Sequence, residues 1–387
     1  MLDEPADGDV VKLSITSLFL NPPWLAGGEI FRPSTLAIRF QIVKNDTRIP
    51  RGAAAADARV IPIGRALDHH VGANEPPDRR SAMIGDLPPY ILAERRAINR
   101  AERTARFCPF CFSGVSDRSP AILMPFVADR AMGWAPVVID ENWGLTSVPS
   151  GRAYSICNSV QCGQCGGLFL DIRFTDHELG RLYDDYRGVE YTALRERYEP
   201  GYVARNDALK AGLPHLAKVE AFLRPHLPTP VRVLDWGGDT GKNTPFQAQA
   251  ATFHIHDISH AEPVAGASFV ARDQIDPGAY DLIVCSDVLE HIPHPLDLLD
   301  DIVACMSERT VLYLGVPYEA FMFRNRDNPD RLAAKRHWHE HVNFFSQAAV
   351  ERLCDHAGLE IIDFALLPVP EPPSEWHMFQ LACRRAR

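Results

Sequence analysis

The feature that most constrains the fold is an alternation of short apolar runs and amphipathic segments that starts at Val231. The apolar runs are typical of strands; in chain order they are VRVLDW, TFHIHD, SFVA, DLIVCSD, TVLYLGV, EIIDFAL and HMFQLACRR. Between them, PLDLLDDIVACM and QAAVERLCDHAGL have the spacing of helices. Such alternation predicts an α/β fold, an open sheet with helices on both faces. Ligands bind these sheets at the carboxyl ends of the strands, where the strand order reverses.

The overall composition is that of a globular protein with more than one domain. The chain has 387 residues, which suits two or three domains, and 46% of them are hydrophobic. The net charge of -10 argues against nucleic acid as a partner, because phosphates attract patches of lysine and arginine. The first residues, MLDEPADGDV, lack the pattern of a signal peptide, and no apolar run is long enough to cross a bilayer. We therefore expect a cytoplasmic protein with no membrane partner.

Residues 1–105 indicate some structure but no function. LSITSLFL and TLAIRFQIV alternate as strands do, and PPYILAERRAINRAERTARF is typical of a helix that leads toward the first cysteines.

Further along, DHELGRLYDDYRG and the segment from 190 to 227 have helical patterns. Thr175 is expected to cap the first of these helices, in a capping box with Glu178.

A glycine-rich turn, WGGDTG, follows the first strand of the alternating half. Both a P-loop and a dinucleotide fingerprint require glycine where Trp236 stands, so neither motif fits. Asp235 at the strand tip would repel a pyrophosphate but suits a cation. Asp257, at the end of the next strand, is placed to accept hydrogen bonds from ribose hydroxyls. These features predict an adenosine ligand with a positively charged amino-acid tail, such as S-adenosylmethionine.

Three segments resemble one enzyme family. VLDWGGDTG resembles the first motif of class I S-adenosylmethionine-dependent methyltransferases. YDLIVCSDVLEHIPHP and RHWHEHVNFFSQAAVERLCDHAGL resemble later segments of the small-molecule branch of that family. The resemblance implies a Rossmann-like seven-stranded sheet over residues 230–387. One departure is Asp239, which stands where the family often has glycine and leaves a non-catalytic module open as an alternative.

The expected cofactor contacts follow from the strand ends. The residues expected to contact the cofactor lie at the ends of the first, second, third and fourth strands. They are Asp235, Trp236, Gly237, Gly238, Gly241, Asp257, Ile258, Asp273, Ser286 and Asp287.

Methyl transfer needs alignment of donor and acceptor, and often a base that takes the proton of the acceptor. His291 follows the fourth strand closely, with Glu290 beside it to orient its ring. A second group, RHWHEH, has histidines at alternate positions, which would point to one side of an extended segment. We expect His291 and His341 as base candidates, with Glu290 and His339 also in the catalytic group. Metal binding by the histidines and glutamate of RHWHEH stays open as an alternative.

Four cysteines form two C-x-x-C pairs, Cys108 with Cys111 and Cys162 with Cys165. Two such knuckles complete a tetrahedron of thiolates around Zn²⁺, and four cysteine ligands predict a structural ion. Cys157 could substitute for one ligand or take no part. The lack of a thioredoxin-like strand-helix context argues against a redox role.

CGQCGGLFLD followed by LYDDYRGVEY adds to the resemblance. A zinc ribbon ahead of such a domain is similar to bacterial methyltransferases that act on sugars or nucleotide-sugars, which implies a small, sugar-linked substrate. The expected organisation is an N-terminal region (1–105), a zinc-ribbon-like domain (106–172), a helical linker or substrate lid (173–229) and the methyltransferase domain (230–387). The lid carries tyrosines that could line a sugar site or simply pack. The rival function is modification of a protein or RNA.

Overall fold

The computed structural model describes residues 10–11, 42–43, 87–114, 117–134, 157–210, 215–258, 262–371 and 374–386. The chain divides into two compact units, one of residues 1–85 and 139–154 and the other of residues 86–138 and 155–387. In the first unit, β1 (Val10–Val11) pairs antiparallel with β2 (Ile42–Val43). The strand predicted over residues 13–20, and most of the one over 35–43, lie outside the described residues.

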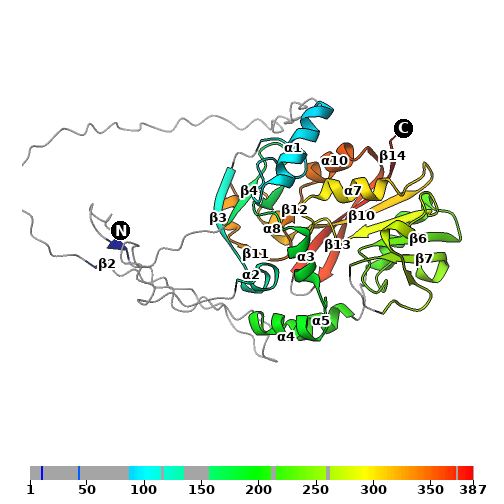
Figure 1. Ribbon diagram of the computed structural model, residues 1–387, viewed down its shortest axis with the longest axis horizontal. Coiled ribbons are helices and arrows are strands. Elements are labelled where there is room, and N and C mark those ends of the chain that lie inside the picture. The colour runs from blue at the N-terminus through cyan, green and yellow to red at the C-terminus, as the bar shows by residue number, and fades with distance from the viewer. Residues whose placement is uncertain are drawn as a thin grey trace, which may run out of the picture. The chain divides into compact units, whose positions relative to one another are not determined.

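A seven-stranded sheet forms the centre of the second unit (Figure 1). Its strand order is β13-β14-β10-β9-β6-β7-β8. The bounds are β6 (Val231–Trp236), β7 (Ala250–His256), β8 (Ser268–Phe269), β9 (Leu282–Ser286), β10 (Val311–Tyr318), β13 (Leu359–Glu371) and β14 (Ser374–Arg385). The strands from β10 to β8 in this order are parallel, and β14 runs antiparallel to both of its neighbours, β10 and β13. All seven predicted runs are therefore strands of one sheet.

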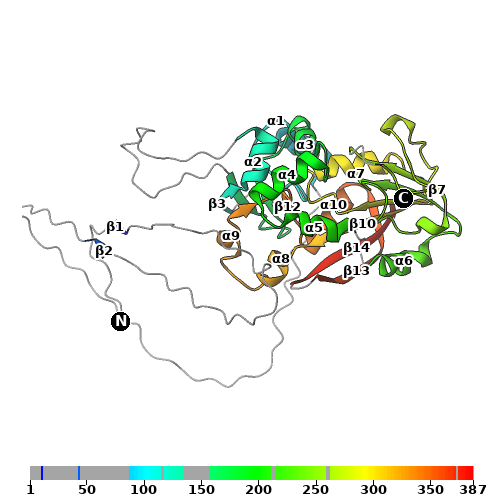
Figure 2. The same ribbon diagram turned by 90° about the horizontal axis from the view of Figure 1, so that it is seen from below.

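Helices cover both faces of this sheet, as predicted. Leu234 of β6 and Ile283 of β9 pack into one apolar cluster with α7 (Pro295–Val303) and α10 (Gln347–His356). Their neighbours in sequence, Val233 and Leu282, point the other way and pack with α6 (Leu216–Leu223). Figure 2 shows α6 on the opposite side from α7. The strand order reverses between β6 and β9, so their carboxyl ends form the switch point where ligands bind.

The cysteine-rich segment folds into a second sheet of five strands, in the order β11-β3-β4-β5-β12. β3 (Asp117–Leu123), β4 (Cys157–Gln161) and β5 (Leu168–Leu170) come from this segment. The two edges, β11 (His337–Trp338) and β12 (Asn343–Phe344), come from the RHWHEH segment and its continuation. The buried Trp338 indole donates to the Ser159 hydroxyl (2.7 Å), which fixes one edge. The ribbon and the catalytic half therefore share a sheet.

The remaining helices lie before, within and between the two sheets along the chain. Their bounds are α1 (Pro89–Ala101), α2 (Pro125–Met132), α3 (Asp176–Tyr183), α4 (Val189–Tyr198), α5 (Tyr202–Lys210), α8 (Ala320–Arg324) and α9 (Arg331–Ala334), and the short 3-10 turns are η2 (Arg224–His226), η3 (Gln247–Gln249) and η4 (Arg272–Gln274). The predicted capping box of Thr175 and Glu178 is present at the start of α3. The first helix is shorter than predicted, because the buried Asn99 accepts from the backbone of Arg106 and Phe107 (3.1 Å each) and turns the chain.

The described helices include none that is both long and apolar enough to span a bilayer.

Candidate active site and metal centre

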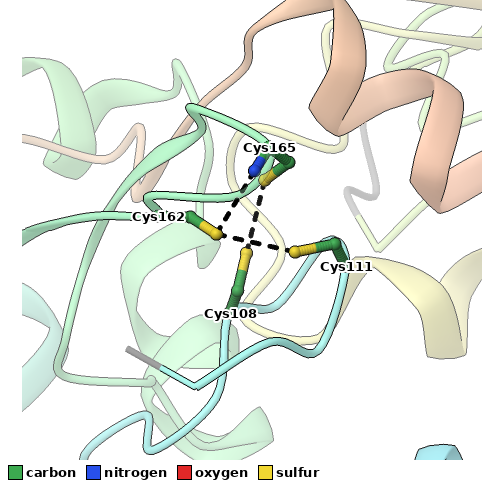
Figure 3. A group of neighbouring side chains, drawn as sticks. All are labelled: Cys108, Cys111, Cys162 and Cys165. Carbon is green, nitrogen blue, oxygen red and sulfur yellow. Dashed lines mark hydrogen bonds between the residues drawn. The ribbon is translucent and has the colours of Figure 1, made fainter. Parts of the chain in front are cut away.

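Four cysteine thiols converge at one end of the five-stranded sheet (Figure 3). The Sγ atoms of Cys108 and Cys165 are 3.6 Å apart, and those of Cys111 and Cys162 are 3.5 Å apart. All four sulfur atoms lie within 4.8 Å of one another. The chemistry of the donor set fits one tetrahedral Zn²⁺, since four thiolates close its coordination shell.

Each pair lies in a tight turn closed by backbone hydrogen bonds. Phe112 N donates to Cys108 O (3.0 Å), and Gly166 N donates to Cys162 O (2.9 Å). Gly167 must stay small, because a Cβ there would lie 2.5 Å from the ring of the buried Phe110. Cys157 lies outside the group, as its thiol donates to the backbone of β3. The remaining cysteines are buried in the catalytic half.

The glycine turn follows β6 directly. Gly237 has φ +82°, and a Cβ there would lie 2.6 Å from Val288 Cγ2. Asp239 also adopts the left-handed conformation (φ 50°), which is the conformation that favours glycine. Aspartate tolerates this conformation, and here its N–H donates to the Asp257 carboxylate (2.8 Å). The departure from the family pattern is thus accommodated within the turn.

Three of the predicted cofactor residues form an acidic group at the carboxyl ends of adjacent parallel strands. Asp235 is the second-last residue of β6, Asp257 follows β7 and Asp287 follows β9. Burial, together with the charges of the other two carboxylates, raises the pKa of Asp235 to about 7, although the Thr244 hydroxyl donates to it. Burial likewise raises the pKa of Asp287 to about 6, and the Ser286 hydroxyl donates to it (3.0 Å). Concentrated negative charge of this kind is stabilised by a cation.

The other predicted cofactor residues lie around this group. Trp236 is buried against His256, with ring centroids 4.6 Å apart. Gly238 and Gly241 complete the turn. Ile258 is 66% exposed, and Asp273 is exposed in η4 after β8.

A second group, Glu290, His291 and His341, lies beyond the end of β9. One ligand atom of each residue lies within 4.8 Å of those of the others, and the two imidazole rings are 4.5 Å apart and nearly perpendicular. Glu290 is 1% exposed, and neither of its carboxylate oxygens has a hydrogen-bond partner in the part of the chain that the structure describes. Burial raises the pKa of Glu290 well above its usual range.

Neighbouring side chains hold both rings. The Tyr183 hydroxyl is 2.7 Å from Nδ1 of His291, and Nδ1 of His341 pairs with Glu319. Burial lowers the pKa of His291 to about 3, so its ring is neutral near pH 7. Burial also acts to lower the pKa of His341, but Glu319 outweighs it and raises the value to about 9.

His339 belongs to a different network. It pairs with Glu199 and lies 3.0 Å from Glu340, which is 2.8 Å from the buried Arg195 of α4. His337 is exposed on β11 and is not brought to the group. The three histidines of RHWHEH therefore lie in different surroundings, and His341 is the one of the three that contacts His291.

The sequence did not point to Arg195, Glu199 or Glu319 as neighbours of the site. Nothing in a helical pattern distinguishes a buried arginine such as Arg195 from a surface one. Glu340 belonged to the RHWHEH group expected from the sequence, although only as a ligand in the metal-binding alternative.

A largely parallel sheet with a glycine turn and acidic strand ends at its switch point is typical of a ligand-binding α/β domain. Residues 209–363 match the model of a family described as a methyltransferase domain. This segment, which is less than half of the chain, is therefore a methyltransferase domain, and the prediction of a class I methyltransferase is confirmed for it.

No curated protein matches the chain. Among solved structures, the chain is similar to Burkholderia thailandensis 1,6-didemethyltoxoflavin-N1-methyltransferase with bound S-adenosylhomocysteine, at 19% identity and a TM-score of 0.39, over 61% of this chain and 98% of that one. It is also similar to magnesium protoporphyrin IX methyltransferase from Synechocystis, at 19% identity and a TM-score of 0.33, over 44% and 81%. Similarity this low says nothing about the substrate.

Proposed function

We propose that this protein transfers a methyl group from S-adenosylmethionine to a small, sugar-linked acceptor, and that its four cysteines hold a structural Zn²⁺. The observation that carries the proposal is the acidic group of Asp235, Asp257 and Asp287 beside the glycine turn of a methyltransferase domain. S-adenosylmethionine suits this acidic group, since it brings an ammonium and a sulfonium charge without a phosphate. Asp257 is the expected partner of its ribose hydroxyls.

The chemistry is an in-line displacement. The bond between sulfur and the methyl carbon breaks with its electron pair left on sulfur, and a new bond forms between that carbon and the acceptor atom. The proton of the acceptor passes to the neutral ring of His291, which Tyr183 orients (2.7 Å). His341, protonated beside Glu319, adds positive charge on the acceptor side. Alignment of the two reactants alone can contribute on the order of 7–11 kcal/mol.

Aromatic rings next to His291 support a sugar acceptor. The ring centroids of Tyr183 and His291 are 5.7 Å apart, and those of Tyr183 and Tyr186 are 5.5 Å apart. Both tyrosines are partly exposed, as a wall that packs on a pyranose ring must be. The other tyrosines of the lid have packing roles: Tyr191 is fully buried and Tyr202 nearly so, and Tyr198 donates to Asp129 (2.6 Å).

The zinc proposal rests on the convergence of four thiols in two tight turns. All nine cysteines of the chain are free thiols, which fits the reducing cytoplasm where we propose that the protein works.

The proposal is tested by methyl transfer from labelled S-adenosylmethionine to nucleotide-sugars, with RNA and protein as rival acceptors. We expect label on a nucleotide-sugar and a large loss of turnover in His291→Ala. The exposed His337→Ala variant is the matched control and should keep its activity. Label on RNA or protein alone would support the rival function, and equal turnover by His291→Ala and the native chain would remove His291 from the role of base.

A further inference from the structure

We propose that Glu290, His291 and His341 form a second metal centre, which binds a divalent transition ion through two imidazoles and one carboxylate. It would be separate from the cysteine site in place and in chemistry.

The first observation is the carboxylate of Glu290. The side chain is 1% exposed, and neither oxygen atom has a hydrogen-bond partner among the described residues. Buried carboxylates are normally paired, hydrogen-bonded or bound to a metal. Nε2 of the neutral His291 lies 3.8 Å from Oε1 of Glu290, beyond hydrogen-bond distance.

The second observation is the convergence of the three side chains. Their ligand atoms lie within 4.8 Å of one another. Ligands about 2.0–2.2 Å from one tetrahedral ion lie roughly 3.4 Å apart, so binding requires the ligand atoms to approach one another by at most about 1.4 Å. Rotation of the two rings can supply this, because His341 lies at the edge of the group and keeps 34% of its side chain exposed.

The third observation is the set of contacts behind the two rings. Nδ1 of His291 faces the Tyr183 hydroxyl, and Nδ1 of His341 pairs with the Glu319 carboxylate. Metal-bound histidines typically use one ring nitrogen for the ion and donate from the other to an oxygen atom, which fixes the tautomer. Both rings therefore have Nε2 left for an ion.

The donor set selects the ion. Two imidazoles and a carboxylate suit Zn²⁺, Fe²⁺ or Mn²⁺, whereas the four thiols of the ribbon suit Zn²⁺. Three protein ligands also leave a coordination position open, as catalytic ions require. An ion here would displace the proton of His341 and make both histidines ligands. It would then take the place of the base, because it would polarise an oxygen of the acceptor and lower its pKa. In the ion-free protein His291 remains the base and His341 its protonated neighbour. This role of the ion rests on the proposed function, whereas ion binding can be measured with no methyl donor present.

The test is the metal content of the full chain after dialysis against Zn²⁺ and then against buffer, measured by mass spectrometry. We expect two ions per chain in the native protein, one in Glu290→Gln and one in His341→Ala. The control His337→Ala removes an exposed histidine nearby and should keep two. Loading with Co²⁺ identifies the remaining ion, because sulfur-to-cobalt charge transfer should persist in both variants of the second centre.

A single ion in the native chain, or two ions in both Glu290→Gln and His341→Ala, would overturn the proposal. Because His341 is on the edge of the group, its variant stays informative if the change at buried Glu290 unfolds the protein. Failure of this test would leave the proposed methyl transfer intact, since binding of S-adenosylmethionine is measured separately.

Discussion

The Asp235→Asn variant should resist unfolding better than the native chain at pH 8, in the absence of any ligand. The pKa of Asp235 is raised from 3.8 to about 7 by burial and by the neighbouring carboxylates. Because the pKa is higher in the folded than in the unfolded chain, the folded state keeps a proton that the unfolded state has lost. The free energy of unfolding therefore falls as the pH rises from about 4 to about 7.

The size of this effect follows from the pKa difference of about 3 pH units, at about 1.4 kcal/mol for each. The ionised carboxylate thus costs the native chain up to about 4 kcal/mol at pH 8, and asparagine avoids that cost while still accepting from Thr244.

Urea unfolding at pH 4, 6 and 8 measures the difference between the two proteins. The two curves should nearly coincide at pH 4 and separate with rising pH. Asp327→Asn, at a residue whose side chain is 91% exposed, is the matched control and should follow the native chain throughout. If the gap between Asp235→Asn and the native chain is the same at all three pH values, the pKa of Asp235 is not raised by burial and by the neighbouring carboxylates as argued.

Three further predictions concern the scaffold. Cys162→Ser should lower the zinc content of the ribbon and its melting temperature, measured by metal analysis and calorimetry, and an unchanged zinc content would contradict the tetrathiolate site. Arg195→Met removes the buried cation beside Glu340 (2.8 Å) and should cost about 3–5 kcal/mol in urea unfolding; a loss below 1 kcal/mol would show that the pair is not buried as described. Gly167→Ala should cost about 1–3 kcal/mol, because its Cβ would lie 2.5 Å from a buried phenyl ring, whereas Gly180→Ala, with open space around it, should cost nothing.

The sheet of the catalytic half could be predicted because each strand carries its own signal. VRVLDW, for example, is a short apolar run bounded by a proline and a glycine turn, and it forms β6 (Val231–Trp236). The four-cysteine group could also be predicted, because the C-x-x-C spacing of each pair is the spacing that places two thiolates on one metal ion.

The edges of the ribbon sheet could not be predicted. β11 and β12 have two residues each, too few for any periodicity, and they pair with strands far away in the sequence. The partners of the histidines depend on the same long-range pairing. His341 contacts His291 because the chain after residue 291 returns to the ribbon sheet, where β11 and β12 pair on either side of His341. The spacing of His341 relative to His337 and His339 in the sequence does not predict this contact.

Calorimetric titration of the full chain with S-adenosylmethionine, and with ATP as a phosphate-bearing counterpart, tests the central claim most directly. The account predicts saturable binding of one S-adenosylmethionine per chain, weakened at least tenfold by Asp257→Ala, and no measurable binding of ATP. Absence of heat with S-adenosylmethionine at millimolar concentration, or tighter binding of ATP, would contradict a site built for a cationic adenosine ligand.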